Sequence, residues 1–429
     1  MPAVTVAGSN NQVLQLNYNA NDATMYAQRL ANSIDAQIGL GALTALNYAG
    51  GKVAPAAAAT GNEVVFSTDT TAVGAVLAID SVTAIVDVAS GPVSLWGGSG
   101  LTSVLAGSGG LSFYAATVPS SLQTIVAGDG ANWIATQSVG GGNYQINLGA
   151  GDDRVRVDTG NATVDMGTGH NTLQLGNGNS FVFSVGADVI NGNSVAGGVG
   201  NDTVQVTSGQ ATINPGSSDF TVFGNDLNPL LMLGGSGSDM VSIGIGGGTV
   251  TAGSGGNSTL IGGLNAFGSP SVYMTGTASG DKLYAIGYGN VVAVAGAGNE
   301  TITGAGNSPF GGTASYGSNS FMAGSGNDTL IAGAGHDTLR AGTGNASMIA
   351  GTAADTFAFQ KGAAGGSDTI SGFKLGIDTL SLTGYGLTAS SALGTALQIN
   401  GGTVLTFADG TTITVAGVPN LSSASVKIG

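Results

Sequence analysis

The chain contains no cysteine and few charged residues, and each shortage excludes a class of protein. Without cysteine, neither disulfide bonds nor thiolate metal sites can hold the fold of 429 residues together. Lysine and arginine number 9 against 24 aspartates and glutamates, which gives a net charge of −15. This balance argues against nucleic acid or an anionic membrane as a partner and favours cations. Because only 8% of residues are charged and mean hydropathy is +0.29, a solvated disordered polymer is excluded as well.

Long hydrophobic runs are also missing. The most apolar stretch, residues 72–88, is interrupted by Asp80 and Asp87, so no segment is expected to insert into a membrane. The start of the chain, MPAVTVAGSNNQ, has neither the basic segment nor the apolar core of a cleaved secretory signal. We therefore expect that, if the protein is exported, the export route reads something other than its N-terminus.

Glycine is what the chain has in excess, with 78 residues against 9 prolines. Glycine does not recur at every third position, which excludes collagen, and this many glycines point to recurrent tight turns. One helix is expected over residues 21–38, where apolar side chains recur every fourth position and Gly39 is placed to end it. After about residue 60 the sequence predicts short strands separated by Gly, Asn, Asp and Ser.

A Gly-x-Gly-x-Asp pattern recurs with a period of nine residues, most clearly over residues 324–357. Degenerate copies follow Gly149 and Gly198, and weaker ones surround Asp239 and Glu300. Glycine permits the turn, and the aspartate offers a charged oxygen to a hard cation. The apolar residue two positions later is expected in the core, as at Leu330, Leu339, Met348 and Phe357. Such short strands can pair only with the coils above and below, which predicts a stacked solenoid.

This nonapeptide resembles the calcium-binding repeat of RTX (hemolysin-type) secreted bacterial proteins of the surface-layer or extracellular-matrix type. Residues 355–382 resemble the segment that follows the β-roll in such proteins, and residues 407–413 resemble their C-terminal strands. The resemblance implies an all-β parallel β-solenoid, a β-roll or β-helix, with a short N-terminal helix and a C-terminal β cap. It also implies Ca²⁺ as cofactor and export by type I secretion machinery, which reads an uncleaved C-terminal signal.

The expected organisation has five parts. Residues 1–50 form an N-terminal segment whose helix is the evident cap of the stack, and residues 51–140 form a β-rich region without a clear repeat. Residues 141–320 form a degenerate solenoid, residues 321–372 the calcium-binding β-roll, and residues 373–429 the C-terminal cap and secretion region.

In the family two nonapeptides make one coil, so turns 18 residues apart stack and hold calcium between them. This register places Asp337 opposite Asp355, which makes that gap the best-furnished site, although Ala353 departs from the repeat. It places Asp328 opposite Ala346, and Asp153 opposite Asn171. The predicted calcium ligands are the turn glycines and sixth-position residues: Gly324, Gly326, Asp328, Gly333, Gly335, Asp337, Gly342, Gly344, Gly351 and Asp355, then Gly149, Gly151, Asp153, Gly167, Gly169, Asn171, Gly198, Gly200, Asp202 and Asp239. The alternative is a solenoid of similar turns that has lost its calcium.

No catalytic site is expected. The sequence has no H-E-x-x-H and no G-x-S-x-G, which argues against a metalloprotease and a lipase. Both histidines, His170 and His336, are interpreted as solvent-facing turn residues, and Trp96 and Trp133 as core residues rather than sugar-stacking platforms.

The favoured interpretation is a secreted, extracellular or cell-surface structural protein that forms a surface layer, fibre or biofilm matrix. Its partners would be further copies of itself in a head-to-tail polymer, the type I secretion machinery, and cell-surface polysaccharide. The first alternative is a calcium-dependent adhesin that binds glycan or a host surface through residues 60–140. A secreted hydrolase with an unrecognised site is the third.

Overall fold

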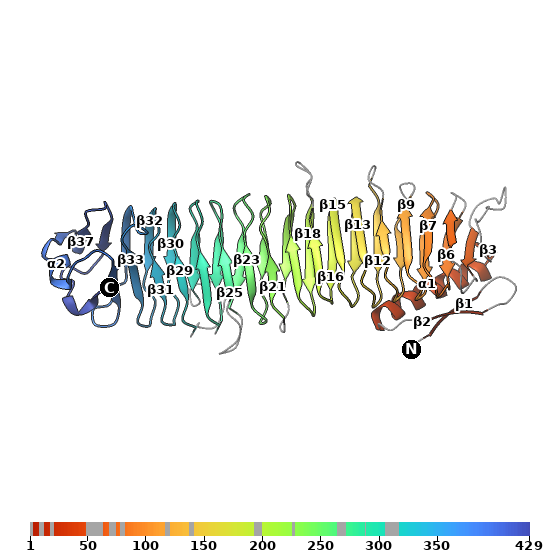
Figure 1. The fold of residues 1–429 in the computed structure, drawn as a ribbon, viewed down its shortest axis with the longest axis horizontal. Coiled ribbons are helices and arrows are strands. Elements are labelled where there is room, and N and C mark those ends of the chain that lie inside the picture. The colour runs from red at the N-terminus through yellow and green to blue at the C-terminus, as the bar shows by residue number, and fades with distance from the viewer. Residues whose placement is uncertain are drawn as a thin grey trace. The chain divides into compact units, whose positions relative to one another are not determined.

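The computed structural model divides the chain into two compact units, Met1–Asp219 (unit 1) and Phe220–Gly429 (unit 2), and each contains stacked coils of parallel strands (Figure 1). The residues it describes are 3–7, 13–17, 21–48, 63–67, 74–77, 82–115, 121–136, 141–192, 200–224, 228–263, 272–287, 289–304 and 317–429. The predicted all-β solenoid with a short helix is confirmed.

Unit 1 alternates its strands between two parallel sheets. The first sheet contains β3 (Thr44–Tyr48), β4 (Glu63–Ser67), β6 (Val82–Asp87), β8 (Ser103–Ala106), β10 (Gln123–Val126), β12 (Asn143–Asn147), β14 (Asn161–Asp165), β16 (Ser180–Ser184) and β18 (Asn201–Val206). The second sheet contains β5 (Gly74–Leu77), β7 (Val93–Gly97), β9 (Leu111–Ala115), β11 (Trp133–Ala135), β13 (Arg154–Thr159), β15 (Thr172–Asn177), β17 (Asp188–Asn191) and β19 (Ala211–Asn214).

Strand β3 pairs with β4, and from β4 to β19 each strand pairs in parallel with the strand two places further along the chain, as the repeat predicts. Val155 on β13 lies opposite Leu173 on β15, and both side chains are buried. The same arrangement already holds β7 against β9 and β9 against β11. The coils therefore begin within the region where the sequence shows no clear period, because backbone pairing tolerates coils of unequal length.

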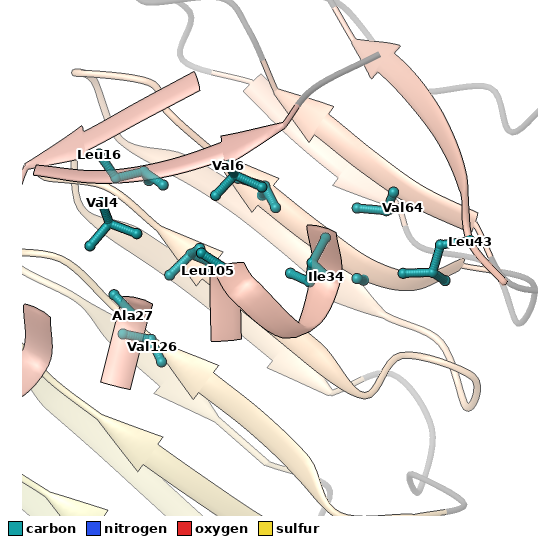
Figure 2. Close-up of a cluster of buried hydrophobic side chains, with 12 residues drawn as sticks. Val4, Val6, Leu16, Ala27, Ile34, Leu43, Val64, Leu105 and Val126 are labelled. Carbon is teal, nitrogen blue, oxygen red and sulfur yellow. The ribbon is translucent and has the colours of Figure 1, made fainter. Parts of the chain in front are cut away.

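Helix α1 (Asn21–Gly39) covers the outer face of the first sheet in unit 1 (Figure 1). Ala27, Ala31 and Ile34 pack with side chains of that sheet and of an antiparallel hairpin formed by β1 (Ala3–Ala7) and β2 (Val13–Asn17) (Figure 2). Their buried partners are Val4, Val6, Leu16, Leu43, Val64, Ala84, Val86, Leu105 and Val126. The helix was expected to cap the end of the stack; it lies along the side, because the strands present small and branched apolar side chains outward there.

Unit 2 repeats the two-sheet arrangement. Its first sheet contains β20 (Asp219–Phe223), β22 (Met240–Ser242), β24 (Thr259–Gly262), β26 (Lys282–Ala285), β28 (Thr301–Gly304), β30 (Asn327–Ile331), β32 (Asn345–Ile349), β34 (Ser367–Ser371), β36 (Leu397–Ile399), β37 (Gly402–Thr406) and β38 (Thr412–Val415). Its second sheet contains β21 (Leu230–Met232), β23 (Gly248–Thr251), β25 (Val272–Thr275), β27 (Val291–Val294), β29 (Ser320–Met322), β31 (Thr338–Arg340), β33 (Thr356–Gln360), β35 (Thr379–Thr383) and β39 (Val426–Ile428).

The core of unit 2 contains the predicted apolar positions of the repeat. Leu330, Leu339, Met348 and Phe357 are all fully buried. Their regular spacing aligns them in two columns, since β30 pairs with β32 and β31 with β33.

The C-terminal segment forms the predicted β cap. Strand β38 continues the first sheet in parallel with β34, after which β37 and β36 add antiparallel strands. Helix α2 (Ala389–Gly394) and a 3₁₀ turn (Ser423–Ser425) complete this end. Within the described ranges, no helix is both long and apolar enough to cross a membrane.

The two tryptophans are not core residues, contrary to the expectation. Trp96 is 37% exposed and Trp133 is 45% exposed, whereas their strand neighbours Leu95 and Ile134 are buried. The alternation of side chains along a strand turns both rings outward.

Candidate calcium-binding turns

The sixth-position residues of the repeat form a buried ladder along the second sheet of unit 2. The backbone N–H of Asn319 donates to Asp337 Oδ1 at 2.9 Å, that of Asp337 to Asp355 Oδ1 at 3.1 Å, and that of Asp355 to Asp378 Oδ1 at 2.9 Å. Each carboxylate thus satisfies a backbone donor of the preceding coil. The predicted juxtaposition of Asp337 and Asp355 is confirmed, while their role as metal ligands stays a prediction.

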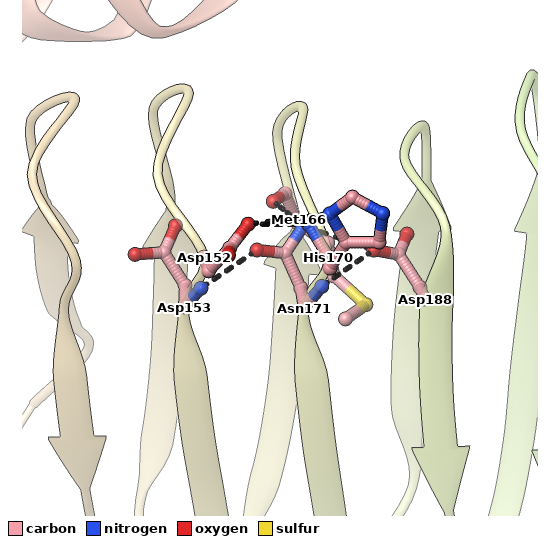
Figure 3. A network of polar contacts seen from close by, with 6 residues as sticks. All are labelled: Asp152, Asp153, Met166, His170, Asn171 and Asp188. Carbon is pink, nitrogen blue, oxygen red and sulfur yellow. Dashed lines mark hydrogen bonds and ion pairs between the residues drawn. The ribbon is translucent and has the colours of Figure 1, made fainter.

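Unit 1 has an equivalent ladder in which amides alternate with carboxylates (Figure 3). The backbone N–H of Asn132 donates to Asp153 Oδ1 at 2.8 Å, and that of Asp153 donates to Asn171 Oδ1 at 2.9 Å. Asn171 in turn donates to Asp188 Oδ1 from its backbone N–H at 3.2 Å and from Nδ2 at 2.9 Å. Asp153 and Asn171 therefore stack as predicted.

The first sheet carries a second ladder of acids, in which Ser258 and Ala346 take two of the positions. Asp328 lies opposite Ala346, as predicted, and its Oδ1 accepts the backbone N–H of Glu300 at 3.0 Å. Asp202 accepts the N–H of Ser180 at 3.0 Å, and Asp239 accepts that of Phe220 at 3.1 Å. These acids are also buried.

The second carboxylate oxygen distinguishes two kinds of turn. In the regular copies it accepts an N–H from its own turn: Gly324 donates to Asp328, Gly333 to Asp337 and Gly351 to Asp355, at 2.6–2.7 Å. Asp281 and Asp378 likewise accept N–H groups of their own turns. In contrast, Asp153 Oδ2, Asp368 Oδ2 and Glu300 Oε2 are buried with no hydrogen-bond partner among the described residues. A buried carboxylate oxygen without a donor is costly unless a proton or a cation compensates it.

Burial raises the pKa of these buried carboxyl groups. It raises the pKa of Asp153 and that of Asp368 to about 7, and raises the pKa of Asp337 to about 6 although backbone donors oppose the shift. The pKa of Glu300 is also raised, by burial and by the adjacent Asp328 carboxylate. A bound divalent cation would favour the charged form of each group.

The turn glycines are required mainly because neighbouring turns touch. A Cβ atom on Gly342 would lie 2.0 Å from the Gly324 carbonyl oxygen, and one on Gly344 would lie 2.0 Å from that of Gly326. None of the glycines of this run for which an added Cβ atom would clash has a positive φ, so close approach of the next coil, and not a left-handed backbone, requires glycine there. In unit 1 a left-handed backbone also favours glycine at Gly167, with φ +62°, and Gly169, with φ +123°.

Close stacking brings turn carbonyls to the gaps between coils. The Gly326 oxygen accepts the N–H of Asn345 at 2.9 Å, and the Gly149 oxygen accepts that of Thr168 at 3.0 Å. The other predicted ligands also lie in stacked turns. Gly151 lies against Gly169 of the next coil, Gly333 against Gly351 of the next coil, and Gly200 against Gly178 of the preceding coil. Gly335 is buried in its turn, and Gly198 lies outside the described residues.

The donor set fits calcium in oxygen chemistry but requires backbone ligands. Calcium takes six to eight oxygen ligands, including carboxylates and carbonyls. Among the described residues no three His, Cys, Asp or Glu side chains converge on one point, so carbonyl oxygens would have to supply most of the coordination. Asp153, Asp368 and Glu300 offer unpartnered oxygens, while Asp337 and Asp355 retain free lone pairs beside their hydrogen bonds.

The histidines take no part in this arrangement. His170 is exposed, and its backbone N–H donates to the exposed Asp152 at 2.9 Å, which lowers the pKa of that carboxyl (Figure 3). His336 is exposed as well, with Nδ1 3.0 Å from the Ala354 carbonyl oxygen. Both were expected to be solvent-facing.

Sequence reasoning missed several members of the ladders, including Asp188, Asp368 and Asp378. They lack the regular glycine pair in front of them, which was the feature sought. A second signal is present: Asp368 and Asp378 are each followed by threonine and an apolar residue, as are Asp328, Asp337 and Asp355. This tripeptide marks the entry to a strand independently of the turn.

Residues 313–348 match the family model described as the RTX calcium-binding nonapeptide repeat, in four copies. The match includes the turns in which Asp328 and Asp337 accept glycine N–H groups, and it confirms the predicted repeat. Repeats of this family bind Ca²⁺. No curated protein matches the chain.

Proposed function

We propose that this chain, which carries RTX calcium-binding repeats, is an extracellular structural protein whose coils are ordered by calcium and then assemble into a surface layer, fibre or matrix. The observation that supports it is the stacked series of buried acids. Between residues 300 and 378 these acids are Glu300, Asp328, Asp337, Asp355, Asp368 and Asp378. Such charges repel one another without a counter-ion, and a cation that binds only the folded coils returns its binding energy as stability.

Each group of residues would have its own role in binding calcium. Carboxylate oxygens of the ladders supply negative charge, and glycine carbonyls of the adjacent turns supply neutral oxygens. Backbone N–H groups hold each carboxylate in place, so that its free lone pairs stay directed into the turn. The ion supplies positive charge between coils.

A calcium titration of the full chain, followed by far-ultraviolet circular dichroism, tests this. At pH 7.5 we expect little β-structure in excess EGTA and full β-structure in millimolar calcium, with no equivalent effect of magnesium. Magnesium serves as the control because it demands a smaller, near-octahedral oxygen cage. Identical spectra in EGTA and calcium would contradict the proposal.

Location and export belong to the same proposal. Proteins with these repeats are typically secreted, and a chain that stays loose in the calcium-poor cytosol suits passage through type I secretion machinery. We propose that the chain has no enzymatic activity. Fusion of residues 373–429 to a reporter, in cells that carry such machinery, tests whether this region directs export.

Assembly is proposed to run head to tail through the strand edges. Edge strand β36 carries Leu397 and Ile399, which are 60% and 46% exposed. An exposed apolar edge recruits another strand, and repetition of such a contact gives an open filament. Light scattering should rise when calcium is added to the micromolar protein, and the double variant Leu397→Lys/Ile399→Lys should abolish the rise. Leu233→Lys, at an equally exposed position away from this edge, is the control; a stable monomer under all these conditions would contradict assembly.

A further inference from the structure

Three aromatic rings lie in contact on the outward face of the second sheet in unit 1. Trp96 on β7 stacks on Tyr114 on β9, with ring centroids 5.7 Å apart and planes inclined by 16°. Tyr114 meets Trp133 on β11 edge to face at 5.5 Å. One ring thus comes from each of three successive coils.

Strand register explains why the rings can meet. Trp96 lies directly opposite Tyr114, whereas the residue opposite Tyr114 on β11 is Ala135. The small alanine leaves room for the Trp133 ring, two residues earlier on the same strand, to lean toward Tyr114. The rings contribute little to the core, whose inward positions in these strands are filled by Leu95, Phe113 and Ile134.

Two arginines continue the same face into the next coil. Arg154 lies opposite Trp133, with its guanidinium carbon 6.0 Å from a Trp133 ring centroid, and Arg156 lies opposite Ala135. Both are exposed, and they are two of only 9 cationic residues in a chain of net charge −15. Arg156 pairs with Asp158 at 2.5 Å, while Arg154 forms no ion pair with the residues that the structure describes.

We propose that Trp96, Tyr114, Trp133, Arg154 and Arg156 form a binding face for an acidic polysaccharide. The face of an aromatic ring carries negative potential and attracts the C–H groups on the apolar face of a sugar ring. Guanidinium groups bind carboxylate or sulfate through paired hydrogen bonds. A row of rings that repeats coil by coil suits a ligand that itself repeats, and the concentration of cations beside it in an acidic chain selects a negatively charged one.

The two tryptophans of the chain both belong to this face, so intrinsic tryptophan fluorescence reports on it alone. The full chain, in saturating calcium, is titrated with hexagalacturonate and with its fully methyl-esterified form, which has the same length without the charges. We expect a saturable change in emission with the acid and at least about tenfold weaker binding of the ester. Absence of a saturable change with hexagalacturonate, or equal affinity for the ester, would overturn the proposal.

Variants separate stacking from charge. Trp133→Ala should weaken binding at least about tenfold by calorimetry, since aromatic anchors dominate such contacts. Arg154→Gln should remove most of the preference for the acid while binding of the ester persists. Tyr273→Ala, at a residue 49% exposed on β25 in unit 2, is the matched control and should change nothing.

Outward-facing side chains can be changed without loss of the fold. An unaltered circular dichroism spectrum, and an unaltered calcium concentration at which half of the β-structure forms (the calcium midpoint), verify this for each variant. Undiminished binding in Trp133→Ala would overturn the proposal. So would a variant that changes the sedimentation of the sugar-free protein but not its sugar binding, because the face would then be a contact between copies of the chain.

Discussion

The regular coils of unit 2 and the degenerate coils of unit 1 use the same ladder but treat the carboxylate differently. Asp337 has one oxygen bonded to Asn319 of the preceding coil and the other to Gly333 of its own turn. Asp153 receives N–H groups of Asn132 at one oxygen and leaves the other buried without a partner. The glycine pair alone does not set this difference, because Asp153 follows such a pair, whereas Asp281 and Asp378 lack it and still accept N–H groups of their own turns. The bonding of the second oxygen therefore indicates where a carboxylate is held in place in advance and where its charge most needs compensation.

The difference has a consequence for calcium. A carboxylate fixed by two backbone donors loses little freedom when an ion binds, so the coils around Asp337 and Asp355 should order at lower calcium concentration. A carboxylate with an unpartnered oxygen, as at Asp153, should depend more strongly on either a proton or an ion. Four predictions test this contrast.

The largest effect is expected from pH in the calcium-free protein. Because burial raises the pKa of Asp153 and of Asp368 to about 7, the folded coils hold protons that the unfolded chain has released. Stability should therefore be greatest below about pH 4 for these groups and fall as pH rises to about 7, by ~1.4 kcal/mol for each unit of pKa difference. For Asp337 the fall should end near pH 6.

The β-structure content in EGTA between pH 4.5 and 7.5, followed by circular dichroism, and thermal unfolding wherever a folded state is present, measure this dependence. Calcium affinity should weaken as the protein gains protons. The calcium concentration at the midpoint of ordering should therefore rise as pH is lowered from 8 to 6, because protons compete with the ion for these carboxylates. A calcium-free protein whose stability increases over the range would refute the assignment of the buried acids.

The next effect concerns the stacked glycines. Gly342→Ala places a Cβ atom about 2 Å from a backbone oxygen and should destabilise the calcium-loaded protein by about 1–3 kcal/mol or more. Gly167→Ala should cost more, since Gly149 O lies equally close and its φ is +62°. Gly394→Ala, at an open position in α2, is the control and should be neutral or slightly stabilising. Equal melting temperatures for the three variants would show that the turns are not tightly stacked.

The local sequence pattern predicts most of this fold. The features that it does not predict depend on contacts between residues far apart in the sequence. The nine-residue period predicts pairing between coils and the burial of Leu330 and Phe357, because each repeat contains its own turn and its own core residue. The side of the stack on which α1 packs depends on outward residues such as Val86 and Leu105, which the period does not mark. The outward tryptophans were missed because strand alternation was not applied in a region without visible repeats.

The third prediction compares the two kinds of carboxylate. Asp337→Ala and Asp355→Ala should each raise the calcium midpoint of the C-terminal coils several-fold, about 1 kcal/mol in binding. Asp153→Ala should affect unit 1 instead and should also weaken the pH dependence in EGTA. Asp219→Ala is the control, because this exposed aspartate precedes the ladder position taken by Phe220. The same calcium midpoint in all four variants would remove the register argument.

The smallest effect is expected at Asp152, the immediate neighbour of Asp153. Its carboxylate is exposed beside His170, and its pKa is lowered chiefly by the backbone N–H of that residue. If calcium is held by ladder positions, Asp152→Asn should leave the calcium midpoint within a factor of about two, as exposed charge pairs contribute little. If the overall negative charge of the turns attracts the ion, Asp152→Asn and Asp153→Asn should shift the calcium midpoint equally. Since the two residues are adjacent in sequence and differ in burial, this pair isolates the geometry of the ladder from the charge of the chain.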